Sequence, residues 1–188
     1  MSTALRNARF LALLEPIQGE AHGFARRICR SDSEGDDLFQ EAVLRSLTHL
    51  EELRDDAKFR FWFFRILTTV HHGRARRAFW KRMVTLDLGD RSGPEPVGED
   101  GSAWEDERFR AARARRVLAL LPAVQREAVV LLEVEGFSLD EIAVLQGASV
   151  SAVKTRVSRA RRALRKFYRK HGLTGEASPL VLQEGSDR

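Results

Sequence analysis

The sequence predicts an all-α protein in which a flexible acidic linker joins two small helical domains. Apolar residues recur at spacings of three and four along the 188-residue chain, and we find no convincing alternation of period two. Between residues 87 and 107 the chain carries eight acidic residues and one basic residue, with Gly and Pro among them. Such a segment cannot bury enough apolar surface to fold alone, so it separates two folded parts.

These patterns give the domain organisation. We expect a first domain at residues 5–83, the acidic linker at 84–104, a second domain at 105–171, and an unassigned tail at 172–188. In the first domain, helical patterns cover residues 4–30 with a bend near Pro16, 34–50 with Asp32 and Ser33 as candidate N-caps, and 56–82. In the second domain, they cover residues 105–119, a helix that Pro122 opens and Gly136 ends, and a final pair of helices at 138–170.

The composition excludes several classes of protein. A hydrophobic content of 43% allows packed cores, and the net charge of +5 suits a polyanionic partner. A single cysteine, Cys29, rules out an internal disulfide framework and a cysteine-rich zinc site. The apolar runs are too short for a membrane span, and the N-terminal stretch FLALL is too short for a signal peptide. We therefore expect a cytoplasmic protein with no membrane insertion.

The helix pair at 138–170 has the pattern of a helix-turn-helix. Ser138 and Glu141 form a capping box, Gly147 stands where a left-handed residue ends a helix, and Ser149 can cap the next helix. A short helix, a tight turn and a longer second helix are typical of this motif, whose second helix enters the major groove of DNA.

The second helix of this pair is basic on one side. Residues 149–170 contain nine Lys or Arg residues and no carboxylate. An apolar stripe predicts the buried side, and it consists of Val150, Val153, Val157, Ala160, Leu164 and Phe167. Cations and short hydroxyls, which hold phosphates and reach base edges, occupy the other side. The plainer alternative is a solvated basic helix.

Two stretches of the first domain carry further signals. Asp37, Gln40, Glu41 and Arg45 share one helix face, which we interpret as solvated or partner-binding because paired carboxylates do chemistry only in a pocket. Residues 58–82 contain eight Lys or Arg residues, no carboxylate and several aromatic rings. Aromatic rings among cations are typical of a platform for unstacked bases.

The aromatic stretch has its own core stripe. That stripe consists of Phe59, Phe63, Ile66 and Val70, with Trp62 beside it, whereas the residues expected to point away are Phe61, Phe64, Thr68 and His72. Alternatively, a small domain buries this helix on two sides, and Phe61 and Phe64 belong to the core. His71 and His72 are adjacent and cannot share a metal ion from one helix face, so we expect no metal site.

The order of these motifs resembles one family, the extracytoplasmic-function (ECF) sigma factors of bacterial RNA polymerase. The segments that carry the resemblance are DDLFQE at 36–41, FRFWFFRI at 59–66, LLP at 120–122, GFSLDEIA at 136–143 and VKTRVSRARRAL at 153–164. The match covers most of residues 10–170. Two departures are Thr69 and Gly73, where the family often has Asn and Asp, and a mid-helix glycine favours a bend.

The resemblance implies a role for each segment. It implies contacts with core RNA polymerase from Asp36, Asp37, Gln40, Glu41 and Arg45. It implies contacts with the −10 element of melted promoter DNA from Phe61, Trp62, Phe64, Arg65, Thr68, Thr69, His72, Arg76 and Arg77. It implies contacts with the duplex −35 element from Ser149, Ser151, Lys154, Thr155, Arg156, Ser158, Arg159, Arg162 and Lys166.

The resemblance therefore implies an alternative-sigma transcription initiation factor. Its expected partners are core RNA polymerase, promoter DNA and an anti-sigma factor, and it needs no cofactor. Nothing in the sequence combines a nucleophile, a base and an orienting group, so we expect no catalysis by this chain. The alternative is a stand-alone helix-turn-helix regulator whose N-terminal part senses a signal or dimerises.

Overall fold

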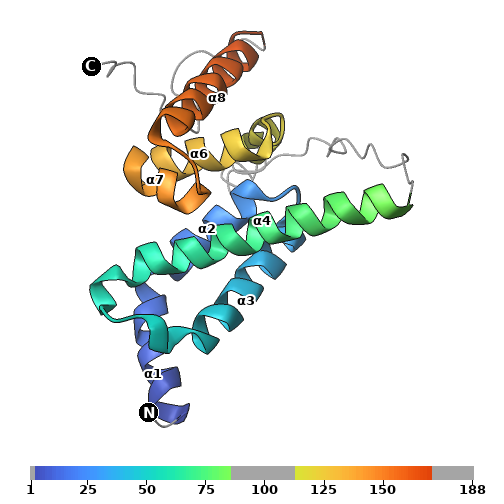
Figure 1. Cartoon of the computed structure of the whole chain (residues 1–188). Helices are drawn as coiled ribbons and strands as arrows, with labels where there is room; N and C mark the ends of the chain where they lie inside the picture. Colours follow the sequence, from blue (N-terminus) through green and yellow to red (C-terminus); the bar gives the residue numbers. More distant parts are fainter. Residues whose placement is uncertain (1–2, 86–112, 171–188) are drawn as a thin grey trace, which may run out of the picture. The chain divides into compact units, whose positions relative to one another are not determined.

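The structure, a computed structural model, describes residues 3–85 and 113–170 (Figure 1). Within these ranges all regular secondary structure is helical, and the chain divides into two compact units, residues 1–93 and 94–188. The prediction of an all-α fold with two helical parts is confirmed. The predicted linker, apart from residues 84 and 85, and the predicted tail lie outside the described residues.

Unit 1, residues 1–93, contains four α-helices and three short 3₁₀ turns within its described part. They are α1 (Thr3–Leu14), η1 (Glu15–Ile17), α2 (Gln18–Ile28), α3 (Asp32–Thr48), η2 (Leu50–Glu52), η3 (Asp56–Lys58) and α4 (Phe59–Thr85). The predicted bend near Pro16 is confirmed as the turn η1, because a proline cannot continue the hydrogen-bond ladder of α1. Helix α4 continues without interruption through Gly73.

The N-cap of α3 lies one residue earlier than the sequence patterns suggested. Ser31 has the extended backbone of an N-cap, and its hydroxyl accepts a hydrogen bond from the Glu34 amide at 3.2 Å. Asp32 already belongs to the helix, so the prediction of Asp32 or Ser33 as the cap was wrong. The side chain of Glu34 accepts from the Arg30 amide at 3.1 Å, which secures the same turn.

Most of the core of unit 1 comes from three helices, and α1 adds Phe10 and Leu14. Its fully buried apolar residues include Phe24 and Ile28 of α2, Leu38 and Ala42 of α3, and Phe63, Phe64 and Leu67 of α4. Helix α3 packs against both α2 and α4. Its contact with α2 is close: a methyl group at Gly35 would lie 2.6 Å from the Cα atom of Arg26.

Unit 2, residues 94–188, contains the predicted helix-turn-helix. Its described helices are 113–119, α6 (Ala123–Glu133), α7 (Leu139–Gln146) and α8 (Val150–Lys170). Ser138 and Glu141 form the capping box, Gly147 has a left-handed φ of 57°, and Ser149 accepts from the Ala152 amide at 3.2 Å. All three predicted caps are therefore confirmed. Of the predicted helix at 105–119, only residues 113–119 lie within the described part.

The buried side of α8 follows the predicted stripe with two exceptions. Val153, Val157, Ala160 and Leu164 are buried, but Val150 and Phe167 are only half-buried, and Tyr168 is buried in place of Phe167. Residue 168 is four residues after Leu164, so the helical period carries it back over the core, whereas residue 167 falls at the edge. None of the described helices is long and apolar enough to cross a membrane.

Candidate functional site

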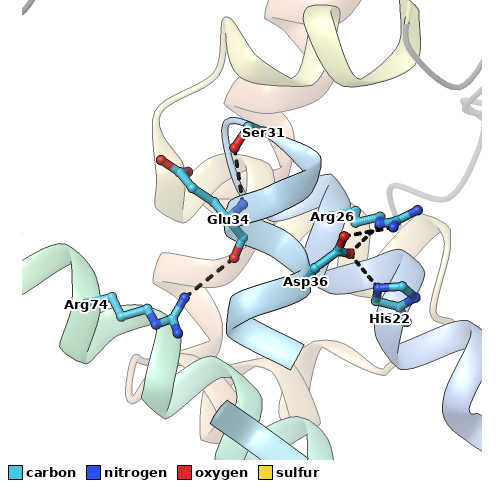
Figure 2. A network of polar contacts seen from close by, with 6 residues as sticks. All are labelled: His22, Arg26, Ser31, Glu34, Asp36 and Arg74. Carbon is cyan, nitrogen blue, oxygen red and sulfur yellow. Dashed lines mark hydrogen bonds and ion pairs between the residues drawn. The ribbon is translucent and has the colours of Figure 1, made fainter. Parts of the chain in front are cut away.

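The acidic residues of α3 divide into two groups, and Asp36 belongs to the inward one. Figure 2 shows its carboxylate between Arg26 and His22 of α2, at 2.6 Å from Arg26 Nε, 2.9 Å from Arg26 Nη2 and 2.6 Å from His22 Nε2. The hydrogen bonds from Arg26 and then His22 lower the pKa of Asp36 from 3.8 to about 2. Asp36 is therefore an anion that fastens α3 to α2.

Glu41 fastens α3 to α4 in the same way. Its carboxylate accepts from Arg74 Nε at 2.7 Å and from Arg45 Nη2 at 2.8 Å, and Arg77 Nη2 lies 3.9 Å away. Burial alone would raise the pKa of Glu41, but the hydrogen bond from Arg74 and the three positive charges outweigh it and lower the pKa.

Arg74 also bonds to the backbone of α3. Its Nη2 donates to the Asp37 carbonyl at 2.9 Å and its Nη1 to the Glu34 carbonyl at 3.5 Å, the latter drawn in Figure 2. One guanidinium on α4 therefore contacts successive turns of α3. No local pattern in the sequence indicates this role for Arg74, because its partners lie 33 to 40 residues earlier in the chain.

The outward group on α3 consists of Asp37, Gln40, Leu44 and Arg45, which are all exposed. Leu44 was not expected in this face, yet its side chain is 66% exposed. A helical signal could have found it, because residue 44 is two turns after Asp37 and one turn after Gln40. A single exposed leucine is ordinary on a protein surface, so Leu44 adds apolar area to this group but does not by itself mark a binding site.

The structure changes the picture of α4. Phe64 and Thr68 are fully buried, so the prediction that they point away from the core was wrong. The Phe64 ring packs 5.2 Å from the ring of Phe24 on α2, whereas the Phe63 ring packs 6.0 Å from the ring of Phe39 on α3. Helix α4 is thus covered on two sides, which is the alternative that the sequence left open for Phe64.

The remaining residues predicted for the −10 element reach the surface to different degrees. Phe61, Trp62 and His72 are half-buried, whereas the exposed ones are Arg65, Thr69, Arg76 and Arg77. Thr69 turns its hydroxyl back to the Arg65 carbonyl at 2.7 Å. Its methyl group and the guanidinium groups therefore form the accessible surface of this part of α4.

On α8 the outward side is polar or cationic apart from the small side chain of Ala163. The exposed residues among those predicted to contact DNA are Ser149, Ser151, Lys154, Thr155, Ser158, Arg159, Arg162 and Lys166. Thr155 donates its hydroxyl proton to the Ser151 carbonyl at 3.0 Å. Such a surface suits hydrogen bonding to phosphates and base edges.

Two arginines of α8 differ from the rest. Arg156, predicted as a DNA contact, is half-buried and donates from Nη1 to the Gln146 side chain at 2.6 Å. Arg161 donates from Nε to Glu133 of α6 at 2.7 Å. Among the described residues, no group of three or more His, Cys, Asp or Glu side chains could hold a metal ion.

Comparisons with known proteins agree with this geometry. The family model for Sigma-70 region 2 matches residues 13–81, and the model for Sigma-70, region 4 matches residues 111–164. The sigma factor RpoE of Bartonella quintana, solved in complex with the anti-sigma factor NepR, has a similar fold. It superposes with a TM-score of 0.67 at 23% identity, over 83% of this chain and 94% of that chain.

Curated relatives carry the same description. The ECF RNA polymerase sigma factor EcfG of Rhodopseudomonas palustris is 33% identical over 141 residues, which span 73% of each chain. The ECF RNA polymerase sigma factor SigM of Mycobacterium tuberculosis is 32% identical over 142 residues, 76% of this chain and 68% of that one. The chain therefore belongs to the ECF RNA polymerase sigma factors and is an alternative sigma factor that directs RNA polymerase to promoters.

Proposed function

We propose that this sigma factor divides promoter recognition between its two units. Residues 5–83 dock on core RNA polymerase and bind the −10 element, residues 105–171 bind the −35 element, and residues 84–104 connect the two. One observation supports this division above the others: the exposed side of α8 offers cations and hydroxyls, whereas the exposed side of α3 offers Asp37, Gln40 and Leu44.

For polymerase docking, we assign the direct contacts to the outward group on α3. Asp37, Gln40, Leu44 and Arg45 can lie along a helical partner, with Leu44 as the apolar centre. Asp36 and Glu41 act indirectly, because their carboxylates already bind Arg26 and Arg74. They fix the angle at which α2, α3 and α4 present that surface.

For the −10 element, we assign the contacts to the accessible side of α4. Arg65, Arg76 and Arg77 are placed to hold the backbone of the melted strand, and the half-buried rings of Phe61 and Trp62 offer stacking edges. Phe64 and Thr68 are removed from this set because they are buried, and they support the helix instead.

For the −35 element, we assign base reading to the stripe formed by Ser151, Thr155 and Ser158, with Lys154 and Arg159 at its edges. Arg162 and Lys166 hold phosphates, and Ser149 caps the helix at the groove. Arg156 acts by positioning rather than by contact.

We also propose that the protein catalyses no reaction. Sigma factors act by binding, and the polymerase carries out the chemistry. Because bacterial promoter DNA lies in the cytoplasm, we expect this protein to be located there. The sigma factor RpoE has been solved in complex with the anti-sigma factor NepR. A second protein of similar fold, CnrH, has been solved in complex with the cytosolic domain of CnrY. By this likeness we expect an anti-sigma factor as the regulatory partner. A stand-alone regulator is not favoured, because it would not need a region 2 unit.

The test is to replace both Asp37 and Gln40 by Arg. Both side chains are exposed, so the free energy of unfolding should stay within about 0.5 kcal/mol of wild type. Like charges placed in a complementary interface cost several kcal/mol, so affinity for core polymerase should fall by a factor of roughly 100 or more. Co-purification with core polymerase and run-off transcription on genomic fragments measure this effect.

The matched control is Glu15→Arg, which reverses an exposed carboxylate in the turn η1, away from α3. It should leave polymerase binding unchanged. A folded Asp37→Arg, Gln40→Arg variant that still captures polymerase would remove the docking assignment. Wild-type protein that never binds polymerase would contradict the proposed function as a whole.

A further inference from the structure

Unit 2 contains a chain of hydrogen bonds that joins its three longest described helices. Gln146, the last residue of α7, donates from Nε2 to the Glu127 carboxylate of α6 at 2.9 Å and to the Val124 carbonyl at 3.0 Å. Its Oε1 accepts from Arg156 of α8 at 2.6 Å. A single amide side chain therefore connects a carboxylate on α6 with a guanidinium on α8.

Both ends of the Gln146 amide have a defined partner. Glu127 is 1% exposed, and a buried carboxylate needs hydrogen-bond donors. The carboxylate and the Val124 carbonyl both accept, so the amide nitrogen must face them and the amide oxygen must face Arg156. The reverse orientation would place two acceptors against each other. The chain of bonds consequently holds Arg156 in one direction.

The position of Arg156 on α8 explains why this chain of hydrogen bonds affects the DNA-facing side of the helix. Arg156 and Arg161 are five residues apart, or about 140° around a helix, so they stand at opposite borders of the buried stripe. Arg161 is bonded directly to Glu133, and Arg156 is bonded through Gln146 to Glu127. Every residue to which we assign −35 contacts along α8 lies on the outward arc between these two. The two arginines thus bind α8 to its neighbouring helices at both borders of the buried stripe.

We propose that Gln146 is a positioning residue for −35 recognition, acting through Arg156 on the orientation of α8. This inference rests on the proposed function of unit 2. A side-chain tip about 6 Å from the helix axis moves by about 1 Å when the helix turns by about 10°. Hydrogen bonds to base edges tolerate only a few tenths of an ångström. Phosphate contacts by long, flexible side chains tolerate more, so loss of the bond chain should affect base selection before total affinity.

The experiment uses full-length protein with core RNA polymerase and a promoter library in which the upstream element is randomised. Sequences that support initiation by each variant are recovered and counted. With Gln146→Leu, which breaks both ends of the chain at similar volume, we expect preference at one or more upstream positions to fall about tenfold. Binding to non-specific duplex DNA and its salt dependence should stay within about twofold.

Four further variants make the result specific. Gln125→Leu, the same substitution at a half-buried residue of α6, should leave the selected sequences unchanged. Arg156→Lys keeps a donor for Gln146 and should retain most of the preference, whereas Arg156→Met should lose it. The double variant Gln146→Leu, Arg156→Met should select no worse than either single one, because both break one chain.

The outcomes separate this inference from the proposed function. If Gln146→Leu lowers the melting temperature but selects the same bases as wild type within twofold, the residue is merely structural and the inference is overturned. If Gln146→Leu does not fold, Arg156→Met decides by the same criterion. If the wild-type holoenzyme selects no upstream sequence at all, the proposed function of unit 2 fails, and the inference fails with it.

Discussion

Helices α3 and α8 each carry charges mostly of one sign, acidic on α3 and basic on α8, yet these charges have different partners. On α3, the carboxylates of Asp36 and Glu41 bind arginines of the neighbouring helices α2 and α4. On α8, which has no carboxylate, Arg156 and Arg161 bind side chains of unit 2, and most of the other cations lie exposed on the outward side. Helix α3 therefore uses much of its charge to hold helices together, whereas α8 leaves most of its cations exposed.

The difference shows that the number of charges on a helix does not tell how many can bind a partner. A helix of like charges repels itself by a few tenths of a kcal/mol for each pair one turn apart. A polyanion removes this repulsion, so contact with DNA, as proposed for α8, would be favourable for this helix. Asp36 and Glu41 of α3 have already gained their partners within the unit. Asp37 and Gln40, which are exposed on the same helix, are the residues to which we assign specificity for polymerase in the proposed function.

The largest change in folding stability is expected for a substitution that tests the close packing of α3 against α2. In Gly35→Ala the new methyl group would lie 2.6 Å from the Cα atom of Arg26, so α2 and α3 must move apart. Overpacking of this kind costs about 1–3 kcal/mol, and it should also disturb the pair between Arg26 and Asp36. Urea denaturation measures the loss. Unchanged stability would show that the two helices are not held at this distance in solution.

The next effect concerns the exposed charge of α8. Replacing Arg162 by Ala should lower the slope of DNA affinity against salt by about one and leave the stability of unit 2 unchanged. Replacing Arg161 by Ala should leave the salt slope unchanged and lower the stability of unit 2. This substitution removes the guanidinium that donates to the Glu133 carboxylate. Salt titrations and melting curves of both variants make the comparison. Equal behaviour of the two would contradict the division into outward and anchoring arginines.

A smaller effect, of opposite sign, is expected for Gly73, a helical glycine of α4. A methyl group at Gly73 would meet only the Nη1 atom of Arg77, at 3.6 Å, which is ordinary contact. Since alanine favours a helix over glycine, Gly73→Ala should stabilise unit 1 by about 0.4–1 kcal/mol. Thermal denaturation measures the gain. A loss of stability would mean that α4 does require flexibility at this position.

The smallest expected effect concerns pH. Because the pKa of Asp36 falls from 3.8 to about 2 on folding, its contacts stabilise unit 1 above about pH 4. That contribution is lost as the pH falls through about 2. Melting temperatures of wild type and Asp36→Asn should therefore converge between pH 4 and pH 2. A constant difference across this range would show that Asp36 does not titrate with Arg26 and His22 as its partners.

Local sequence was sufficient for much of unit 2. The capping box at Ser138 and Glu141, the left-handed Gly147 and the cap at Ser149 each depend on residues within a few positions of one another. The apolar stripe of α8 is equally local, because the helical period alone decides which side chains share a face. The helix-turn-helix and its basic surface could therefore be predicted without a structure.

Tertiary structure decided which of the predicted site residues remain exposed for a partner. The burial of Phe64 depends on Phe24, and the bond from Glu41 joins it to Arg74, 33 residues later. The chain from Glu127 through Gln146 to Arg156 spans three helices. The sequence by itself determined the helices, the caps of the helix-turn-helix and the sign of each face. Which charges bind within the unit depends on how helices cross, and that is set by packing between segments far apart in the chain.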